Sequence, residues 1–194
     1  MFFYFLYLVK PEELIEKPED YFDSEFADKY EKSGAYRRIQ KKMTERILEL
    51  MEINKGLILD IGCGTGFSAE IAENHGEVIG IDKSLEMLKI AKNKGYKVLY
   101  ADMLHLPFKE NSFDFILSVS TVQWLKDREE YKKFSKELFF VLKNQGRAGI
   151  QFYMNDENTG NFARSFKKLF SGNLVIDDKN TKQEKKYLIL NKDK

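Results

Sequence analysis

The segment GLILDIGCGTGF, residues 56–67, constrains the fold of this chain more than any other. An apolar run at 56–61 passes directly into three alternating glycines, Gly62, Gly64 and Gly66. Glycines let a backbone turn sharply and approach a ligand closely. A buried strand that ends in such a loop is typical of the first strand of a nucleotide-binding α/β sheet.

Apolar runs alternate with helical periodicities over most of the chain. The pattern predicts strands at 56–61, 77–82, 96–102, 113–120 and 148–154, and helices at 37–51, 67–75, 84–94, 128–142 and 156–171. Two further strands, 173–178 and 185–190, are separated by a polar turn and are expected to pair antiparallel. This alternation predicts an α/β fold: a mostly parallel sheet with helices on both faces and an antiparallel closing hairpin.

Composition limits the class of protein. The 194 residues correspond to one domain, and a net charge of +1 gives no overall basic bias toward nucleic acid. One cysteine excludes an internal disulfide, and with two histidines at unrelated spacings no metal site is expected. The apolar residues 1–9 are too few for a membrane span, which needs about 20, and they lack a basic region before them. We therefore expect a cytoplasmic protein without a membrane anchor.

The glycine loop could hold ATP, a dinucleotide or S-adenosylmethionine. No Gly-Lys-Ser/Thr follows the glycines, which excludes a P-loop for ATP. The dinucleotide fingerprint has its third glycine one position later, where this chain has Phe67. The carboxylate of Asp60 would also repel a pyrophosphate at short range. S-adenosylmethionine carries a sulfonium and an ammonium and no phosphate, so this loop favours it as the cofactor.

Further polar residues stand where other strands of the sheet are expected to end. Asp82 is predicted to accept hydrogen bonds from both ribose hydroxyls, and Asp102 to receive the adenine amino group. Met87 is among the apolar residues that would flank the ring. Cys63 is expected to offer its backbone to the cofactor and not to act as a nucleophile, since no histidine is spaced to activate it.

Several segments together resemble known families. LDIGCGTGF, GID and ADMLHLPFKENSFDFILS resemble class I S-adenosylmethionine-dependent methyltransferases across residues 56–120. KPEELIEKPEDYFDSEFADKY, RRIQKKMTERILELM, SVSTVQWL, IQFYMNDEN and FSGNLVIDDKNTKQEKKYLIL resemble the small-subunit (18S-type) rRNA guanine-N7 methyltransferases of ribosome biogenesis, from about residue 10 to residue 190. The resemblance implies a Rossmann-like, seven-stranded methyltransferase domain over 1–194, in which residues 1–35 cover the site and residues 36–190 form the core.

The resemblance also implies the residues of the site. The cofactor would contact Asp60, Gly62, Cys63, Gly64, Gly66, Asp82, Lys83, Met87, Asp102, Met103 and Ser118. Tyr30 and Trp124 would lie near the methyl group or the target base, although core packing is an alternative role for Trp124. Guanine N7 has a lone pair and no proton to lose, so no catalytic acid or base is expected.

Two partners follow from the resemblance: small-subunit rRNA and a small zinc-binding activator protein. The strand at 96–101 is expected at the sheet edge, with Tyr96, Val98 and Tyr100 on one face and Leu99 on the other. Such an edge invites pairing with another chain. We therefore expect the activator to add a strand there.

The chain departs from the family pattern at two places, and two alternative functions remain open. Met154 stands where the family has proline, and the chain ends at NKDK without the basic tail typical of eukaryotic members, which favours an archaeal version. A small-molecule methyltransferase and a cofactor-binding assembly factor without required catalysis are the alternatives. A basic face formed by Arg37, Arg38, Lys41, Lys42 and Arg46 would favour RNA, but alternating charge is also typical of a solvated helix face.

Overall fold

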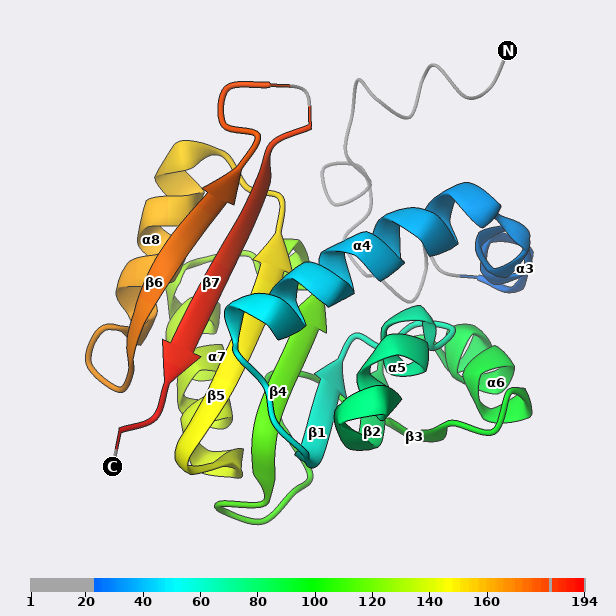
Figure 1. Cartoon of the computed structure of the whole chain (residues 1–194), viewed down its shortest axis with the longest axis horizontal. Helices are drawn as coiled ribbons and strands as arrows, with labels where there is room; N and C mark the ends of the chain where they lie inside the picture. The colour runs from blue at the N-terminus through cyan, green and yellow to red at the C-terminus, as the bar shows by residue number, and fades with distance from the viewer. Residues whose placement is uncertain (1–22, 182, 194) are drawn as a thin grey trace.

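The computed structural model describes residues 23–181 and 183–193 (Figure 1). The expectations for residues 1–22, including the apolar start and the first half of the segment 10–30, lie outside the described residues.

A single seven-stranded sheet, in the order β3-β2-β1-β4-β5-β7-β6, organises the described residues. The first five strands pair in parallel, and β7 pairs antiparallel with both β5 and β6. The predicted α/β fold with its antiparallel closing hairpin is therefore confirmed. The strands are β1 (Gly56–Ile61), β2 (Gly76–Asp82), β3 (Lys97–Tyr100), β4 (Phe113–Val119), β5 (Leu142–Phe152), β6 (Ser171–Asp177) and β7 (Lys185–Asn191).

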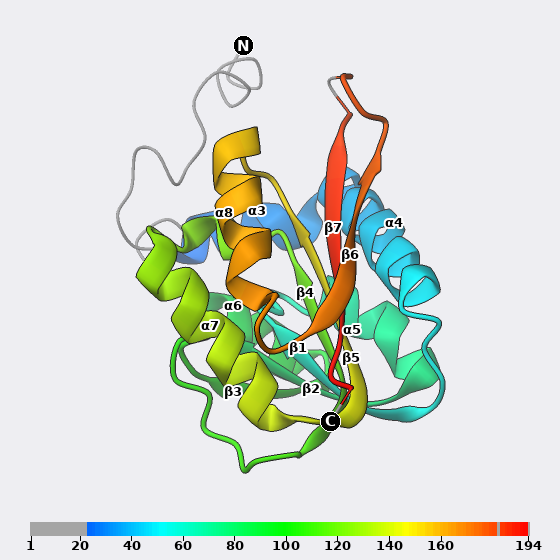
Figure 2. The same ribbon diagram turned by 90° about the vertical axis from the view of Figure 1, so that its left-hand side faces the viewer.

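Helices cover both faces of the sheet. They are α3 (Ser24–Lys32), α4 (Gly34–Leu50), α5 (Phe67–Ala72), α6 (Leu85–Asn93), α7 (Arg128–Val141) and α8 (Asp156–Phe166), with short 3-10 turns η2 (Glu73–His75) and η3 (Val122–Trp124). Figure 2 shows α4 and α5 on one side of the sheet and α7 and α8 on the other. Within the described residues, no helix has both the length and the apolar character needed to cross a membrane.

Each face of the sheet has its own hydrophobic core. Under α7 and α8 the core is rich in phenylalanine: Phe166 packs edge to face on Phe134 and Phe162, which stack on each other. Under α4 and α5 it is aliphatic, with Ile47 and Ile58 fully buried. These two cores hold the strands rigidly and so fix the positions of the loops at their ends.

Side-chain caps begin most of the helices. Ser84 caps α6 by accepting a hydrogen bond from the Met87 amide. Asp23, Ser33, Asp127 and Asn155 cap α3, α4, α7 and α8 in the same way. Glycine in the left-handed conformation, Gly66, precedes α5 instead.

Most elements begin or end one to three residues from their predicted bounds, while β5 and α8 differ by five or more and β3 is shorter than predicted. Strand β5 begins at Leu142 and not at 148, because the polar residues that follow Leu142 form a bulge within the strand. The Gln145 amide in this bulge donates a hydrogen bond to the Lys192 carbonyl at 2.6 Å. Helix α8 ends at Phe166 and not at 171, since the chain from Ser171 joins β6. Strand β3 covers only Lys97–Tyr100, and the ring of Tyr96 lies against the glycine loop, so Tyr96 is not part of the edge.

Candidate cofactor and substrate site

The glycine loop joins β1 to α5 at the edge where the parallel strands end (Figure 1). Gly62, Gly64 and Gly66 all have positive φ, at 74°, 53° and 90°. A Cβ at Gly62 would lie 2.1 Å from Thr121 Oγ1, and one at Gly66 would lie 2.4 Å from the Tyr96 ring. A Cβ at Gly64 would meet nothing within 4 Å, so this glycine faces open space. The loop is thus fixed at both ends and accessible in its middle.

Asp60 lies under the loop and is fully buried. The Ser68 hydroxyl, in the first turn of α5, donates a hydrogen bond to Asp60 Oδ2, while Asp60 Oδ1 has no partner among the described residues. Burial raises the pKa of this carboxyl from 3.8 to about 7. An unsatisfied carboxylate oxygen at this position fits a cationic ligand.

Asp82, at the end of β2, is part-buried and connects the loop to α6. One carboxylate oxygen accepts the Gly64 amide at 2.9 Å and the other accepts the Ser84 amide at 2.8 Å. Burial raises the pKa of Asp82. The Lys83 backbone also hydrogen-bonds to this carboxylate, so the carboxylate is already oriented before any ribose hydroxyl arrives.

The ends of β2 and β3 meet through an ion pair. Lys83 Nζ lies 3.5 Å from Asp102 Oδ2, and Asp102 Oδ1 accepts the Leu104 amide at 2.9 Å. Met103 is half-buried against the core, and Met87 is buried on α6. The structure thus brings Lys83, Asp102 and Met103 together beside Asp82, and their contact with a cofactor stays a prediction.

Ser118 and Cys63 are the two predicted contacts that the structure places least favourably. Ser118 is fully buried on β4, and its hydroxyl donates to the Ile61 carbonyl at 3.0 Å, which holds β4 against β1 just before the loop. Cys63 is buried against Gly80, and burial raises the pKa of its thiol. Both side chains support the loop, and a contact from either to the cofactor stays a prediction.

Helix α3 lies over the glycine loop. The Tyr30 ring stacks on Phe67 with a centroid distance of 5.2 Å and on Tyr36 at 5.0 Å. Burial raises the pKa of the Tyr30 hydroxyl, and the charge of Asp82 raises it further. Tyr30 therefore lies near the predicted cofactor residues Asp60 and Asp82, and its contact with the methyl group or the target base stays a prediction.

Lys94 connects α3 to the loop, a role that no sequence pattern indicated. Its Nζ lies 2.9 Å from Glu31 Oε1, donates to the Thr65 carbonyl at 3.0 Å, and stands 4.9 Å above the Phe67 ring. These contacts join three segments that are far apart in the chain, so periodicity and spacing could not reveal them.

Buried polar atoms without partners gather at this edge of the sheet. Among the described residues, these atoms are Glu31 Oε2, Asp60 Oδ1, Thr65 Oγ1, Gln123 Oε1, Gln151 Nε2 and, apart from the others on α7, Ser135 Oγ. Native proteins rarely leave such groups unpaired, because each costs about 1–3 kcal/mol. Their concentration around the loop and the ends of β4 and β5 is therefore typical of a ligand site.

Trp124 ends η3, which follows β4, and its ring is half-buried. Thr121, just before η3, fills the space over Gly62. The structure thus places the VQWL segment beside the loop. Its contact with a target base stays a prediction.

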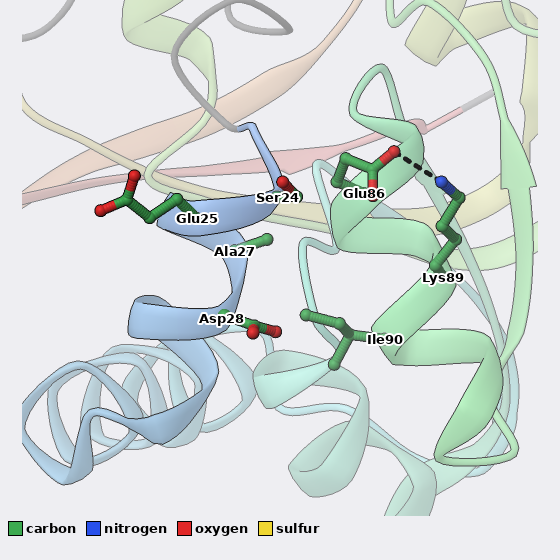
Figure 3. Close-up of a pocket in the computed structure, with 7 residues that line it drawn as sticks. All are labelled: Ser24, Glu25, Ala27, Asp28, Glu86, Lys89 and Ile90. Atoms are coloured by element: carbon green, nitrogen blue, oxygen red, sulfur yellow. Dashed lines mark hydrogen bonds and ion pairs between the residues drawn. The ribbon is translucent and has the colours of Figure 1, made fainter.

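A shallow hollow of about 220 Å³ lies between α3 and α6. Figure 3 shows its lining, with Glu86 paired to Lys89 on α6 and Asp28 opposite on α3. The hollow is smaller than a typical cofactor pocket of 300–1,000 Å³ and includes none of the predicted site residues.

Ion pairs neutralise most of the basic face expected on α4. Arg37 pairs with Glu70 at 2.8 Å, and Arg46 pairs with Asp177 at 2.9 Å. Lys41 lies 3.8 Å from Glu45. This face therefore gives little independent support for RNA binding.

Known proteins resemble the chain at two levels. A family model described as "Methyltransferase domain" matches residues 59–150. The 18S rRNA (guanine-N(7))-methyltransferase bud23 of Schizosaccharomyces pombe is 33% identical over 92% of this chain and 72% of its own length. The 18S rRNA (guanine(1575)-N(7))-methyltransferase of Saccharomyces cerevisiae is 36% identical over 89% of this chain and 68% of its own length.

A solved structure supports the fold independently. A SAM dependent methyltransferase from Aquifex aeolicus superposes with a TM-score of 0.69 at 19% identity, covering 88% of this chain and 99% of that chain. With the glycine loop, the carboxylates at three strand ends and the match over nine-tenths of the chain, the predicted family, activity and cofactor are confirmed. The chain is an S-adenosylmethionine-dependent methyltransferase and belongs to the family of the 18S rRNA (guanine-N7)-methyltransferases.

Proposed function

We propose that this enzyme methylates N7 of a guanine in small-subunit rRNA. The observation that carries the proposal is the extent of the match: 36% identity to an enzyme named for this reaction covers 89% of the chain. The general methyltransferase domain accounts only for residues 59–150. The similarity to the rRNA methyltransferases extends to segments outside that domain. We expect these segments to determine which molecule accepts the methyl group.

The reaction requires orientation more than acid–base chemistry. When bound, S-adenosylmethionine supplies a methyl group whose S–C bond breaks as the N7 lone pair forms the new C–N bond, leaving a neutral thioether and a cationic 7-methylguanine. The chain therefore has to align two reactants and exclude water, and alignment alone can contribute about 7–11 kcal/mol. Tyr30 and Phe67, stacked over the loop, suit the exclusion of water.

The cofactor residues are proposed from the geometry above. Asp82, preoriented by two backbone amides, would hold the ribose hydroxyls, and Asp60 Oδ1 would balance the ammonium group. Gly64 leaves room for the methionine part of the cofactor. Asp102 would receive the adenine amino group, with Lys83, Met87 and Met103 around the ring. We also infer that the described part of the segment 1–35 covers the site, since Tyr30 stacks on Phe67 and Glu31 pairs with Lys94.

The test of function uses unmodified small ribosomal subunits and methyl-labelled S-adenosylmethionine. We expect label in the rRNA at a single guanine, mapped by selective chain cleavage at 7-methylguanine. Asp82→Asn should abolish both cofactor binding and labelling, whereas Asp28→Asn, an exposed change on α3, should leave both intact. Labelling of small molecules but never of rRNA would contradict the proposal. Subunit assembly that is unaffected by Asp82→Asn would favour the assembly-factor alternative.

We also propose that β3 pairs with a small zinc-binding activator protein. Strand β3 lies at the sheet edge, and Leu99 and Tyr100 are 42% and 53% exposed there. Exposed edges with large apolar side chains favour strand addition. Leu99→Lys should abolish co-purification with the activator, while Leu174→Lys, 39% exposed on the opposite edge strand β6, should not. A chain that is monodisperse and fully active alone would contradict the proposal.

A further inference from the structure

Ser120 connects the ends of β4 and β5 in an unusual backbone conformation. It follows β4 directly and has φ of 56°, in the left-handed region that non-glycine residues rarely occupy. Its amide donates to the Gln151 carbonyl at 3.1 Å. Such backbone strain is typical of functional sites, where surrounding contacts maintain it.

The same residue orients two glutamine side chains. The Ser120 hydroxyl donates to Gln151 Oε1 at 2.9 Å, and the Ser120 carbonyl accepts from Gln123 Nε2 at 2.8 Å. A carbonyl can only accept, so Gln123 cannot turn its amide over without placing two oxygens against each other. The orientation of Gln123 is therefore fixed by the backbone.

Each glutamine keeps one buried atom without a partner. Gln151 is fully buried on β5, and its Nε2 is an unused donor. Gln123, on η3, has an unused acceptor in Oε1. Burying such atoms is costly unless a ligand supplies the missing hydrogen bonds. Together the two side chains present one donor and one acceptor around a single residue.

This pair lies beside the glycine loop. Ser120 is followed by Thr121, whose side chain packs over Gly62, and β4 is the neighbour of β1 in the sheet. The pair is thus at the same edge as Asp60 but on the β4–β5 side of the loop. A planar ligand held there would be next to the methionine part of the cofactor.

We propose that Gln151 Nε2 and Gln123 Oε1 recognise the O6 and N1–H groups of the acceptor guanine, an inference that rests on the proposed function. Guanine presents an acceptor at O6 and a donor at N1, which match the two unused atoms and leave N7 free. Adenine presents the reverse order, a donor at C6 and an acceptor at N1. Because Gln123 is fixed by Ser120, adenine would leave buried groups unpaired, which selects strongly against it.

The test compares three nucleotides at the mapped position of the rRNA, which carry guanine, hypoxanthine (inosine) or 2-aminopurine. Inosine keeps O6 and N1–H and lacks the 2-amino group, while 2-aminopurine lacks both O6 and the N1 hydrogen and keeps N7. We expect guanine and inosine to react within about threefold of each other, and 2-aminopurine about 100-fold more slowly. Gln123→Met and Gln151→Met should lower kcat/KM for guanine by about 10–100-fold and leave that for 2-aminopurine nearly unchanged.

Controls separate recognition from folding. Ser135→Ala removes the unpartnered hydroxyl on α7, away from the site, and should leave base selectivity unchanged. The Kd of S-adenosylhomocysteine should be the same in all variants. If Gln151→Met does not fold, Gln123→Met alone tests the proposal, since Gln123 is only part-buried and its replacement should be tolerated. An equal loss with all three bases, or unchanged selectivity, would overturn the proposal.

A binding measurement keeps this proposal separate from the proposed function. If the wild-type enzyme labels no rRNA, the proposed function fails. Binding of guanosine and of 2-aminopurine riboside, each in the presence of S-adenosylhomocysteine, then tests whether the two glutamines recognise guanine. A preference for guanosine that both variants lose would support the two glutamines as the recognition pair. Equal binding of the two nucleosides by the wild-type enzyme would overturn it.

Discussion

The two halves of the sheet differ in the chemistry at their carboxyl ends. The β1–β3 half has carboxylates, Asp60, Asp82 and Asp102, at three neighbouring strand ends. The β4–β5 half has neutral amides, Gln123 and Gln151. Carboxylates suit a cofactor that carries two positive charges, whereas paired donors and acceptors suit a neutral base. One sheet edge thus supports two kinds of recognition.

Two buried lysines, one near each end of β7, differ in the same way: one lies at the site end of the sheet and the other at the opposite end. Lys186, at the site end, donates to the Met154 carbonyl at 2.8 Å and to Asp156 at 2.9 Å, so it holds the chain that follows β5. Lys192, at the other end, donates to the Phe139 and Leu142 carbonyls at 2.7 Å each. Both residues are almost fully buried, but only Lys186 lies at the β5 end that carries Gln151, since it pairs with Phe152.

The pH dependence of stability tests the carboxylate half most strongly. The pKa of Asp60 is about 7 in the folded chain, against 3.8 for an unperturbed aspartate. Between these two pH values the folded state therefore binds more protons than the unfolded state. Unfolding free energy should therefore fall by roughly 4 kcal/mol as pH rises from about 4 to about 7, and Asp60 should add no slope above that. Denaturant titrations at several pH values measure this.

Asp60→Asn isolates the contribution of Asp60 from that of Asp82, whose pKa burial also raises. The variant should lose most of the slope and be more stable than the wild type at pH 8, while its cofactor affinity falls. An unchanged pH profile in the variant would show that Asp60 is ionised at all these pH values, contrary to its burial.

Gly66→Ala tests the geometry of the loop. A Cβ at φ of 90° is strained and would lie 2.4 Å from the Tyr96 ring, so we expect a loss of about 3 kcal/mol in unfolding free energy. Gly34→Ala is the matched control, because Gly34 begins α4 and its Cβ would meet nothing within 4 Å. That change should be neutral or stabilise by up to about 1 kcal/mol. Equal effects of the two changes would argue against a constrained loop.

The β1–β3 half was largely predictable from sequence because its signals are local. The strand at 56–61 was predicted with its observed bounds, since an apolar run ends in alternating glycines. The cap at Ser84 and the carboxylates at the strand ends follow from spacing along the chain. Local chemistry and position in the sheet were enough to identify the cofactor.

The rest depends on contacts between distant segments. Helix α3 is short and polar and buries only Ala27. It is held by Tyr30 on Phe67 and by Glu31 on Lys94, contacts that spacing along the chain could not show. Gln123 and Gln151 become a pair only through the register of β4 and β5. Residue types alone could not show that these two amides share one serine.

The two buried lysines sharpen the comparison along β7. Lys186→Met and Lys192→Met should each lower the unfolding free energy by about 2 kcal/mol. The first leaves the Met154 carbonyl and the Thr159 hydroxyl without the lysine donor, and the second leaves the Phe139 and Leu142 carbonyls without one. Only Lys186→Met should also lower methyl transfer, by about tenfold, because it releases the chain after β5. Denaturant titration and single-turnover rates measure the two effects. Equal rates for both variants would contradict a special role of Lys186.

The smallest expected effect concerns the attachment of α3 to the carboxylate half. The Glu31–Lys94 pair is about one-quarter exposed and reaches the loop through Thr65, so Glu31→Gln should weaken S-adenosylhomocysteine binding by about 2–5-fold. The Glu25–Lys29 pair on the same helix is largely exposed and touches only its own helix, so Glu25→Gln should change neither Kd nor Tm. Calorimetric titration of both variants measures the difference. Because salt screens an ion pair of this exposure, the effect of Glu31→Gln should shrink at 1 M salt. A loss that is the same at both salt concentrations would mean that α3 is held by the stacking of Tyr30 and not by this charge.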